Sequence, residues 1–245
     1  MSYSCFLLGF VAAPSVVLAI LIRRQSRRAP AYASGIPILA LIAFAYTTPW
    51  DQYLVARGIW TYPDGRVFAT FGGVPAEEYV FFVAQTLLVG LLAWWLRGRI
   101  PLRRATGGGS LKARLLPACA CLGVWAVSWY GLRFQPATYA ALILLWALPP
   151  LCLQWVFAPR VIARNGRFLV TALAISGVYL SAADAYALNA GIWSISEATA
   201  LGWKFGNVPV EEILFFTVTS LLVLQGLLLW EWARARHKGW PSKVH

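Results

Sequence analysis

Two short segments of the sequence each place a pair of adjacent glutamates one helical turn before a pair of phenylalanines. They read Pro75-x-Glu77-Glu78-x-x-Phe81-Phe82 and Pro209-x-Glu211-Glu212-x-x-Phe215-Phe216. A carboxyl group held among apolar rings tends to keep its proton and can act as a general acid, more so beside a second carboxylate. Adjacent helical positions lie about 100° apart, so the two glutamates of each pair have different environments. The positive end of a helix favours the ionised form, and the sequence leaves the protonation state open.

A plainer interpretation is that proline and glutamate simply begin a helix, where both are favoured. For a single copy we would prefer that interpretation. Both copies, however, follow the same upstream residues, which are Asp51-x-Tyr53 with Gly58-Ile59-Trp60 and Asp184-x-Tyr186 with Gly191-Ile192-Trp193. The offset between copies is 133 residues as far as the tryptophan and 134 after it. Helix initiation needs neither a second glutamate nor a phenylalanine pair, so the duplication favours a functional site.

The other repeated residues have two interpretations each. Asp51 and Asp184 are either polar residues at a membrane boundary or acid–base partners of the glutamates. Trp60 and Trp193 are either aromatic residues of the membrane interface or walls of a pocket whose ring faces stabilise a cation. Their fixed place beside Gly-Ile in both copies favours the pocket.

The composition requires membrane-embedded elements to position these residues. Of the 245 residues, 60% are apolar and 12% are charged, with a mean hydropathy of +0.64. A soluble domain carries about 25% charged residues, so a soluble globular protein is excluded. The four cysteines fall in apolar runs, and we expect them to be small buried residues rather than disulfides or metal ligands. They are Cys5, Cys119, Cys121 and Cys152.

Seven continuous apolar runs are long enough to cross a bilayer as helices. They are Cys5–Ile22, Ala33–Pro49, Glu78–Leu96, Leu115–Leu132, Tyr139–Phe157, Phe168–Leu188 and Glu211–Trp230. Of the 21 lysines and arginines, 17 follow the first, third, fifth and seventh runs. Because basic residues stay on the cytoplasmic side, we expect the N-terminus outside, the C-terminus in the cytoplasm and the protein in the inner (plasma) membrane. The net charge of +12 is then a topology signal and not a nucleic-acid surface.

The duplication predicts an all-α integral membrane fold built from two parallel three-helix repeats, spans 1–3 and 5–7. Span 4 joins them and restores the orientation of the second repeat, so a pseudo-two-fold axis should follow the membrane normal. The expected organisation is residues 1–97 for the first repeat, 98–138 for a basic linker with span 4, 139–231 for the second repeat and 232–245 for a basic tail. The linker holds the flexible run Gly107-Gly108-Gly109-Ser110. A site between the repeats would receive both glutamate pairs.

Several kinds of chemistry have no residues to support them. No glycine-rich nucleotide fingerprint is present, His237 and His245 both lie in the tail, and the seventh span contains no lysine for a retinal Schiff base. We therefore expect no cofactor and no metal. The remaining chemistry is acid–base catalysis on an apolar substrate dissolved in the membrane.

With these motifs, the sequence resembles the non-flavin lycopene cyclase domain family of carotenoid biosynthesis, in the form that fuses two small membrane units. The resemblance implies a lycopene β-cyclase that converts linear lycopene to β-carotene via γ-carotene, with catalysis by Glu77, Glu78, Glu211 and Glu212. We rank Glu77 and Glu211 slightly ahead of their neighbours. The aromatic candidates for binding the substrate or a cation are Trp60, Phe81, Phe82, Trp193, Phe215, Phe216, Tyr53 and Tyr186. The implied partners are lycopene, membrane lipids and other carotenoid enzymes.

Relatives within such a family could also form ε- or γ-rings or act on C50 chains. Two alternative functions belong to other classes of protein. The first is a transporter or ion pathway, because buried acids and internal repeats are also found there. The second is a carotenoid-binding protein without turnover. Against a transporter, the acids cluster at one face and no polar residues line a path across the bilayer.

Overall fold

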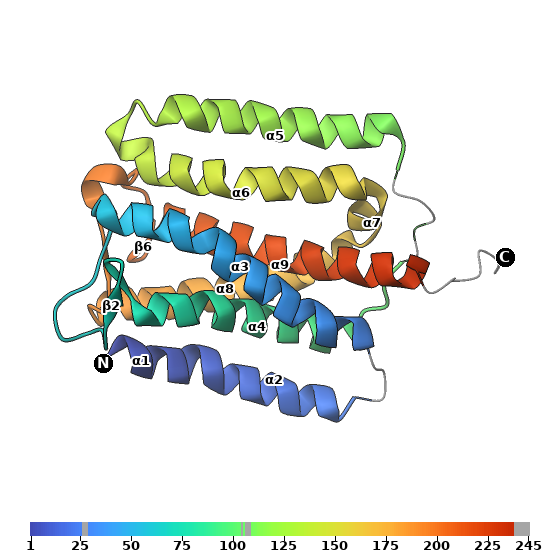
Figure 1. The fold of residues 1–245 in the computed structure, drawn as a ribbon, viewed down its shortest axis with the longest axis horizontal. Coiled ribbons are helices and arrows are strands. Elements are labelled where there is room, and N and C mark those ends of the chain that lie inside the picture. The colour runs from blue at the N-terminus through green and yellow to red at the C-terminus, as the bar shows by residue number, and fades with distance from the viewer. Residues whose placement is uncertain (26–28, 104, 106–108, 238–245) are drawn as a thin grey trace.

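A computed structural model of the chain describes residues 1–25, 29–103, 105 and 109–237. Within this part, seven helical segments are long and apolar enough to cross a membrane, and they form one bundle (Figure 1). The first segment is built from α1 (Tyr3–Phe6), a π-helical stretch η1 (Leu7–Ala12) and α2 (Ala13–Arg23). The others are α3 (Pro30–Ala56), α4 (Ala76–Arg97), α5 (Leu111–Gly131), α6 (Thr138–Phe157), α8 (Gly166–Asn189) and α9 (Val210–His237). The predicted number and order of spans are confirmed.

Helices α4 and α9, which begin with the glutamate pairs, form the centre of the bundle. Helix α4 packs against α2, α3, α8 and α9, whereas α9 packs against α3, α4, α6 and α8. Helix α5 packs mainly on α6 at the edge, as Figure 1 shows. The short helix α7 (Pro159–Arg164) follows α6, and the single turn η2 (Gln135–Ala137) precedes α6. The two motif-bearing helices are therefore the most enclosed elements of the fold.

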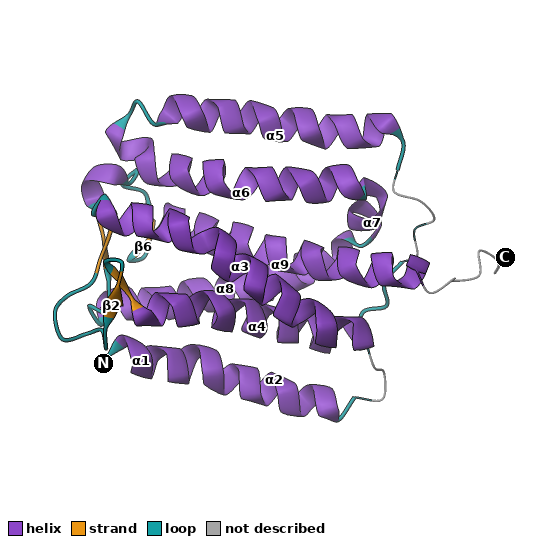
Figure 2. Ribbon diagram, viewed as in Figure 1, coloured by secondary structure: helices purple, strands orange, loops and turns teal. Residues whose placement is uncertain are grey.

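Short strands gather at the end of the bundle where the N-terminus lies (Figure 2). Strand β1 (Trp60–Thr61) pairs antiparallel with β4 (Ser194–Ile195), so the two motif contexts are joined directly. Two hairpins lead into the central helices: β2 (Thr70–Phe71) with β3 (Val74–Pro75), and β5 (Lys204–Phe205) with β6 (Val208–Pro209). A turn η3 (Glu197–Thr199) lies between β4 and β5. In the first hairpin, Gly72 and Gly73 take positive φ values of 59° and 82°, which suits a two-residue turn.

Hydroxyl groups from neighbouring helices compensate for prolines inside the spans. Pro150 has no N–H to donate to the Trp146 carbonyl four residues earlier. That carbonyl accepts a hydrogen bond from the Tyr46 hydroxyl at 2.8 Å. Pro14 frees a carbonyl in the same way, and the Tyr179 hydroxyl donates to it at 2.8 Å. Helices can keep such prolines in an apolar environment because another side chain satisfies the free carbonyl.

The predicted end of the second span at Pro49 is wrong. Helix α3 continues through this proline to Ala56, because a proline removes only the one hydrogen bond that its own nitrogen would have made. Asp51 and Tyr53 therefore lie inside the helix and not at its end. Likewise Pro75 and Pro209 do not occupy the first helical turn; each ends a strand directly before the helix.

The prediction that the cysteines are buried is also wrong. Cys5 and Cys119 are exposed, and Cys121 and Cys152 are half-buried free thiols. Cys119 lies on α5, which offers only one side to the bundle and turns its other sides outward. An apolar run in a membrane protein can face lipid, so hydropathy alone does not indicate burial in protein.

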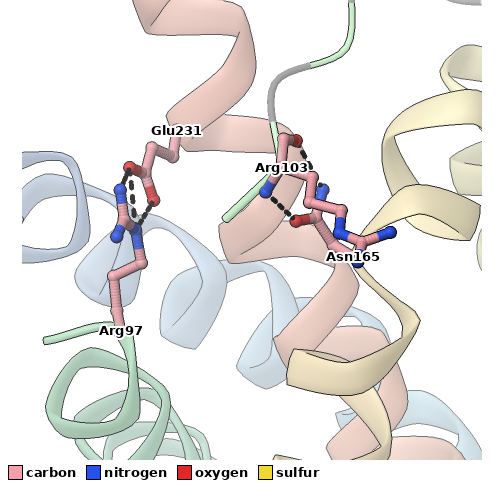
Figure 3. A network of polar contacts seen from close by, with 4 residues as sticks. All are labelled: Arg97, Arg103, Asn165 and Glu231. Carbon is pink, nitrogen blue, oxygen red and sulfur yellow. Dashed lines mark hydrogen bonds and ion pairs between the residues drawn. The ribbon is translucent and has the colours of Figure 1, made fainter. Parts of the chain in front are cut away.

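At the end of the bundle opposite the strands, polar contacts join the ends of helices (Figure 3). The Arg97 guanidinium, from the end of α4, lies 3.0 Å from the Glu231 carboxylate of α9. The Asn165 side chain accepts a hydrogen bond from the Arg103 backbone N–H at 2.8 Å and donates to the carbonyl of the same residue at 3.2 Å. The predicted linker glycines Gly107 and Gly108, and the basic residues Arg27, Arg28, Arg104, Lys238 and Lys243, lie outside the described residues, as does His245.

Candidate active site

The first glutamate of each pair binds the loop that precedes its own helix. Glu77 Oε1 accepts hydrogen bonds from the Phe68 backbone N–H at 2.8 Å and the Ser4 hydroxyl at 2.7 Å. Glu211 Oε1 accepts from the Leu201 backbone N–H at 2.6 Å. Both side chains are buried. Glu77 and Glu211 therefore anchor the preceding loops to α4 and α9.

The second glutamate of each pair is held by phenol and indole groups. Glu78 Oε1 accepts hydrogen bonds from the Tyr3 hydroxyl at 2.8 Å and the Tyr62 hydroxyl at 2.6 Å. Glu212 Oε1 accepts from the Tyr139 hydroxyl. Hydrogen bonds to one oxygen of each carboxyl group fix its orientation and leave the other oxygen for a substrate.

Glu78 and Glu212 line the same cavity, which has a volume of about 310 Å³. The two glutamate residues are buried, being 5% and 3% exposed. All the other lining residues are aromatic: Tyr3, Trp60, Tyr62, Phe81, Trp193, Phe215 and Phe216. We call this cavity, with its two buried acids and seven aromatic rings, the chamber.

The two tryptophans cross between the halves of the chain. Trp60 comes from the first motif context, yet its indole N–H donates to the Tyr139 hydroxyl at 2.9 Å and approaches Glu212 Oε1 at 3.4 Å. Trp193 comes from the second context and packs on the Tyr3 ring with centroids 5.1 Å apart. Residues from both halves therefore complete the surroundings of each acid.

The two aspartates lie beside the chamber and not in its wall. Asp184 Oδ1 accepts a hydrogen bond from the Trp193 indole at 3.0 Å. Asp51 is fully buried, and neither of its carboxyl oxygens has a hydrogen-bond partner among the described residues. Asp184 thus positions an aromatic wall, whereas Asp51 is an unsatisfied acid inside α3.

The structure separates the aromatic candidates into three groups. Trp60, Phe81, Trp193, Phe215 and Phe216 line the chamber. Phe82 lines a neighbouring groove instead. Tyr53 and Tyr186 are 43% and 44% exposed and lie outside the chamber, where Arg57 covers the Tyr53 ring at 5.0 Å. The repeated phenylalanines therefore line the chamber or the neighbouring groove, whereas the repeated tyrosines Tyr53 and Tyr186 line neither.

Sequence reasoning missed the three tyrosines that hold the acids. Tyr3 and Tyr139 each lie in the first turn of the first helix of a predicted repeat, and this shared place is the signal that could have found them. Tyr62 follows Trp60 by two residues, but the matching position in the second copy is Ile195. Burial, and then the nearby Glu78 carboxyl, raise the pKa of the Tyr62 hydroxyl well above its ordinary value. Tyr62 therefore stays a proton donor in its hydrogen bond.

No group of three or more His, Cys, Asp or Glu side chains in the described part of the chain is placed to hold a metal ion. The chamber offers proton donors, proton acceptors and ring faces. Such a set can protonate an apolar molecule, stabilise the resulting cation and remove a proton from it.

Fold and chamber together define a multi-pass membrane protein with two buried acids in an aromatic site. The chain belongs to the lycopene cyclase family, whose model matches residues 1–96 and 136–230. It is 37% identical to a lycopene beta-cyclase of Halobacterium salinarum, over 96% of this chain and 98% of that protein. It is also 36% identical to a bifunctional lycopene cyclase/phytoene synthase of Gibberella fujikuroi, over 87% of this chain and 37% of that longer protein. It is 33% identical to the bifunctional lycopene cyclase/phytoene synthase of Aspergillus oryzae, over 82% of this chain and 35% of that protein. No solved structure shows significant similarity to the chain.

Proposed function

We propose that this chain is a lycopene β-cyclase, an intramolecular lyase that closes both ends of linear lycopene into β-rings, via γ-carotene, without a cofactor. The observation that carries the proposal is the placement of Glu78 and Glu212 on one aromatic chamber inside a membrane protein. The similarity to named lycopene beta-cyclases supports this substrate.

In the proposed mechanism, Glu78 and Glu212 together carry one proton, because two carboxylates cannot both ionise cheaply in a dry site. The protonated one donates to the terminal double bond of lycopene, which creates a tertiary cation. The neighbouring internal double bond attacks this cation and closes the ring. The ionised glutamate then removes a proton from the ring and leaves a new double bond. One proton is added and one is removed, so the product is an isomer of the substrate.

The aromatic walls suit the cationic intermediate. Trp60 and Phe215 pack edge to face with centroids 5.5 Å apart, and Trp193 lies across the chamber on Tyr3. Ring faces attract a cation most strongly when water is excluded. Glu77 and Glu211 serve this mechanism as positioning residues that hold the loops, and Asp51 and Asp184 as acids beside the site.

We also propose that the two predicted repeats are parallel and related by a pseudo-two-fold axis along the membrane normal, with α5 joining them. Residues at equivalent positions meet wherever they lie close to such an axis. Three pairs do so at successive depths: Thr61 with Ser194 at 2.7 Å, Gln85 with Thr219 at 2.9 Å and Arg97 with Glu231 at 3.0 Å. The two segments that match the family model support repeat boundaries near residues 97 and 139.

The proposed location is the cell inner membrane, with the N-terminus outside and the basic helix ends in the cytoplasm. Arg97 is the last residue of α4, whose first turn carries Glu78, so it lies at the end of the bundle opposite the chamber. Figure 3 shows it together with Arg103. Basic residues at this face suit contact with anionic lipids. Association with other carotenoid enzymes is part of the same proposal.

Chromatography of pigments from lycopene-accumulating cells that express the chain tests the proposed function. We expect β-carotene as the end product and γ-carotene as an early intermediate. An ε-ring product, or reaction only of a C50 carotenoid, would retain the acid–base chemistry and overturn the assigned product. Unchanged pigments, with protein verified in the membrane, would overturn cyclase activity and favour binding without turnover.

A further inference from the structure

A second cavity of about 800 Å³ lies beside the chamber, between α3, α4, α6 and α9. Its walls are mostly apolar, with Leu39, Ile42 and Ala43 from α3 and Trp146 and Pro150 from α6. Helix α9 contributes Leu222 and Val223. We name this cavity the α3–α6 groove. None of its residues takes part in the mechanism above except Phe215, which borders both spaces.

Phe215 is the partition between the groove and the chamber. On the chamber side its ring contacts Trp60 at 5.5 Å. The ring also stacks with Trp50 at a centroid distance of 5.8 Å, and Trp50 meets Trp60 edge to face at 5.6 Å. Trp50 stacks in turn on Trp146 of the groove at 4.7 Å. A continuous row of rings therefore runs from the groove into the chamber. A long apolar molecule could follow this row with its end beside the acids.

The groove opens towards lipid. Ile42 and Tyr46, which line it, are 55% and 41% exposed at the surface of the bundle. Helices α3 and α6 approach each other in the half of the bundle that carries the strands, where the Trp50 indole donates to the Leu142 carbonyl at 3.2 Å. They are still in contact near the middle of both helices, where Tyr46 donates to the Trp146 carbonyl. They separate towards the other end, with α9 visible between them (Figure 1). An entrance at this place faces the phase in which a carotenoid dissolves.

Polar groups in the groove donate hydrogen bonds within the protein. The Gln85 amide donates to Thr219 at 2.9 Å, and the Gln154 amide donates to the Leu222 carbonyl at 3.0 Å. Two other polar atoms of the lining residues, Trp146 Nε1 and Gln154 Oε1, have no hydrogen-bond partner among the described residues. The rest of the lining is mostly apolar, and this part suits an occupant without hydrogen-bonding groups. The polyene chain of a hydrocarbon carotenoid has this chemistry.

Two positions of the groove differ in burial from their counterparts in the second repeat. The α8 counterparts of Leu39 and Ala43, at an offset of 133 residues, are Ala172 and Ser176. Both counterparts are buried in the protein, whereas Leu39 and Ala43 are half-buried and line the groove. The two halves therefore differ at these two positions of the groove.

We propose that the α3–α6 groove is the track by which the polyene enters from the membrane and is held while its end reacts in the chamber. The inference rests on the proposed cyclase function. With one track, the two ends of the symmetric substrate react one after the other. After the first ring has closed, the product leaves the groove and binds again in the reverse orientation, with its other end in the chamber.

A larger side chain in the groove should block the track without touching the acids. Ala43→Phe fills the groove, and Leu41→Phe is the matched control because Leu41 is 69% exposed on the same helix. Ile42→Trp is a second blocking variant, tolerated in folding because Ile42 lies at the mouth. We expect both blocking variants to raise KM for lycopene at least tenfold with little change in kcat, because interactions with the polyene are the same in ground and transition states.

The deciding measurement is retention of lycopene by purified protein in lipid nanodiscs, which needs no turnover. We expect the parent and Leu41→Phe to retain the pigment and both blocking variants, shown to be folded by thermal unfolding, to retain at least tenfold less. Equal retention by all four proteins would overturn the track, even with a parent that makes β-carotene. Failure of the parent to cyclise bound lycopene would overturn the proposed function and leave the difference in retention as evidence for the track.

Discussion

The two glutamates of each pair should respond differently to the same substitution. Glu78→Gln and Glu212→Gln remove an acid or base from the chamber while keeping the size of the side chain. Glu77→Gln and Glu211→Gln keep an acceptor oxygen for the loop, since an amide oxygen can still accept the Phe68 or Leu201 backbone N–H. We therefore expect loss of chemistry in the first two variants and a moderate loss of stability in the other two.

The magnitudes follow from what each residue contacts. Proton transfer by a positioned group contributes about 10²–10⁴-fold to a rate, or about 3–5 kcal/mol of barrier. Glu78→Gln and Glu212→Gln should lower kcat by at least this factor. At Glu77 two hydrogen bonds to a carboxylate become bonds to a neutral amide, at about 1 kcal/mol each. Glu77→Gln should lower the free energy of unfolding by about 2 kcal/mol, and Glu211→Gln by about half of this, because the hydrogen bond from the Leu201 backbone N–H is the one affected.

Initial rates in lipid vesicles, well below the unfolding temperature of every variant, separate the two effects. We expect Glu77→Gln and Glu211→Gln to retain activity within about threefold of the parent, a change of about 0.7 kcal/mol. The opposite ranking in folded proteins, with Glu77→Gln inactive and Glu78→Gln active, would refute the assignment of the chamber acids. That outcome would support the preference that we drew from the sequence.

Two further variants test the surroundings of the acids and the axis. Tyr62→Phe removes the 2.6 Å hydrogen bond to Glu78, and we expect kcat to fall about tenfold by loss of one charged hydrogen bond; Tyr53→Phe, outside the chamber, is the control. Because the pKa of Tyr62 is raised, its phenol is neutral from about pH 6 to 9. The ratio of parent to Tyr62→Phe rates should therefore stay constant over that range, and a ratio that changes with pH would contradict the role of Tyr62 as a neutral donor. Arg97→Glu places two carboxylates together on α4 and α9 and should cost about 1–3 kcal/mol in the free energy of unfolding, with Arg24→Glu as an exposed control. The exchange of Arg97→Glu with Glu231→Arg should recover most of the loss in thermal unfolding, and no recovery would count against the contact.

The sequence predicted the spans and the duplicated acids because both signals are local. Hydropathy runs define helices, and identical residues in order define a repeat. The end of α3 could not be predicted, since Pro49 resembles a stop signal and continues as a helix only within the bundle. The buried state of Asp51 follows from that extension, which places it inside a packed helix.

The contacts of Tyr3 and Tyr139 with the glutamates could not be predicted for a different reason. Tyr3 and Glu78 are 75 residues apart, and Tyr139 and Glu212 are 73 apart. Their contact depends on how the first helix of each half packs against the last, which no local pattern encodes. Helical spacing likewise showed that the glutamates of a pair face different ways, but only the position of the outer loop decides which one faces the chamber.

The adjacent pair is best understood as an anchor followed by a reactive group. A glutamate in the first turn of a membrane helix is free to rotate unless something holds the chain there. In both halves the first glutamate binds a backbone N–H nine or ten residues upstream, which fixes the hairpin on the helix. About 100° further round the helix, the second glutamate is then directed inward to a tyrosine of its own half. Trp60 crosses to Glu212, and Trp193 crosses to Tyr3. Neither acid has complete surroundings within one half, so the duplication produces a single chamber with two acids.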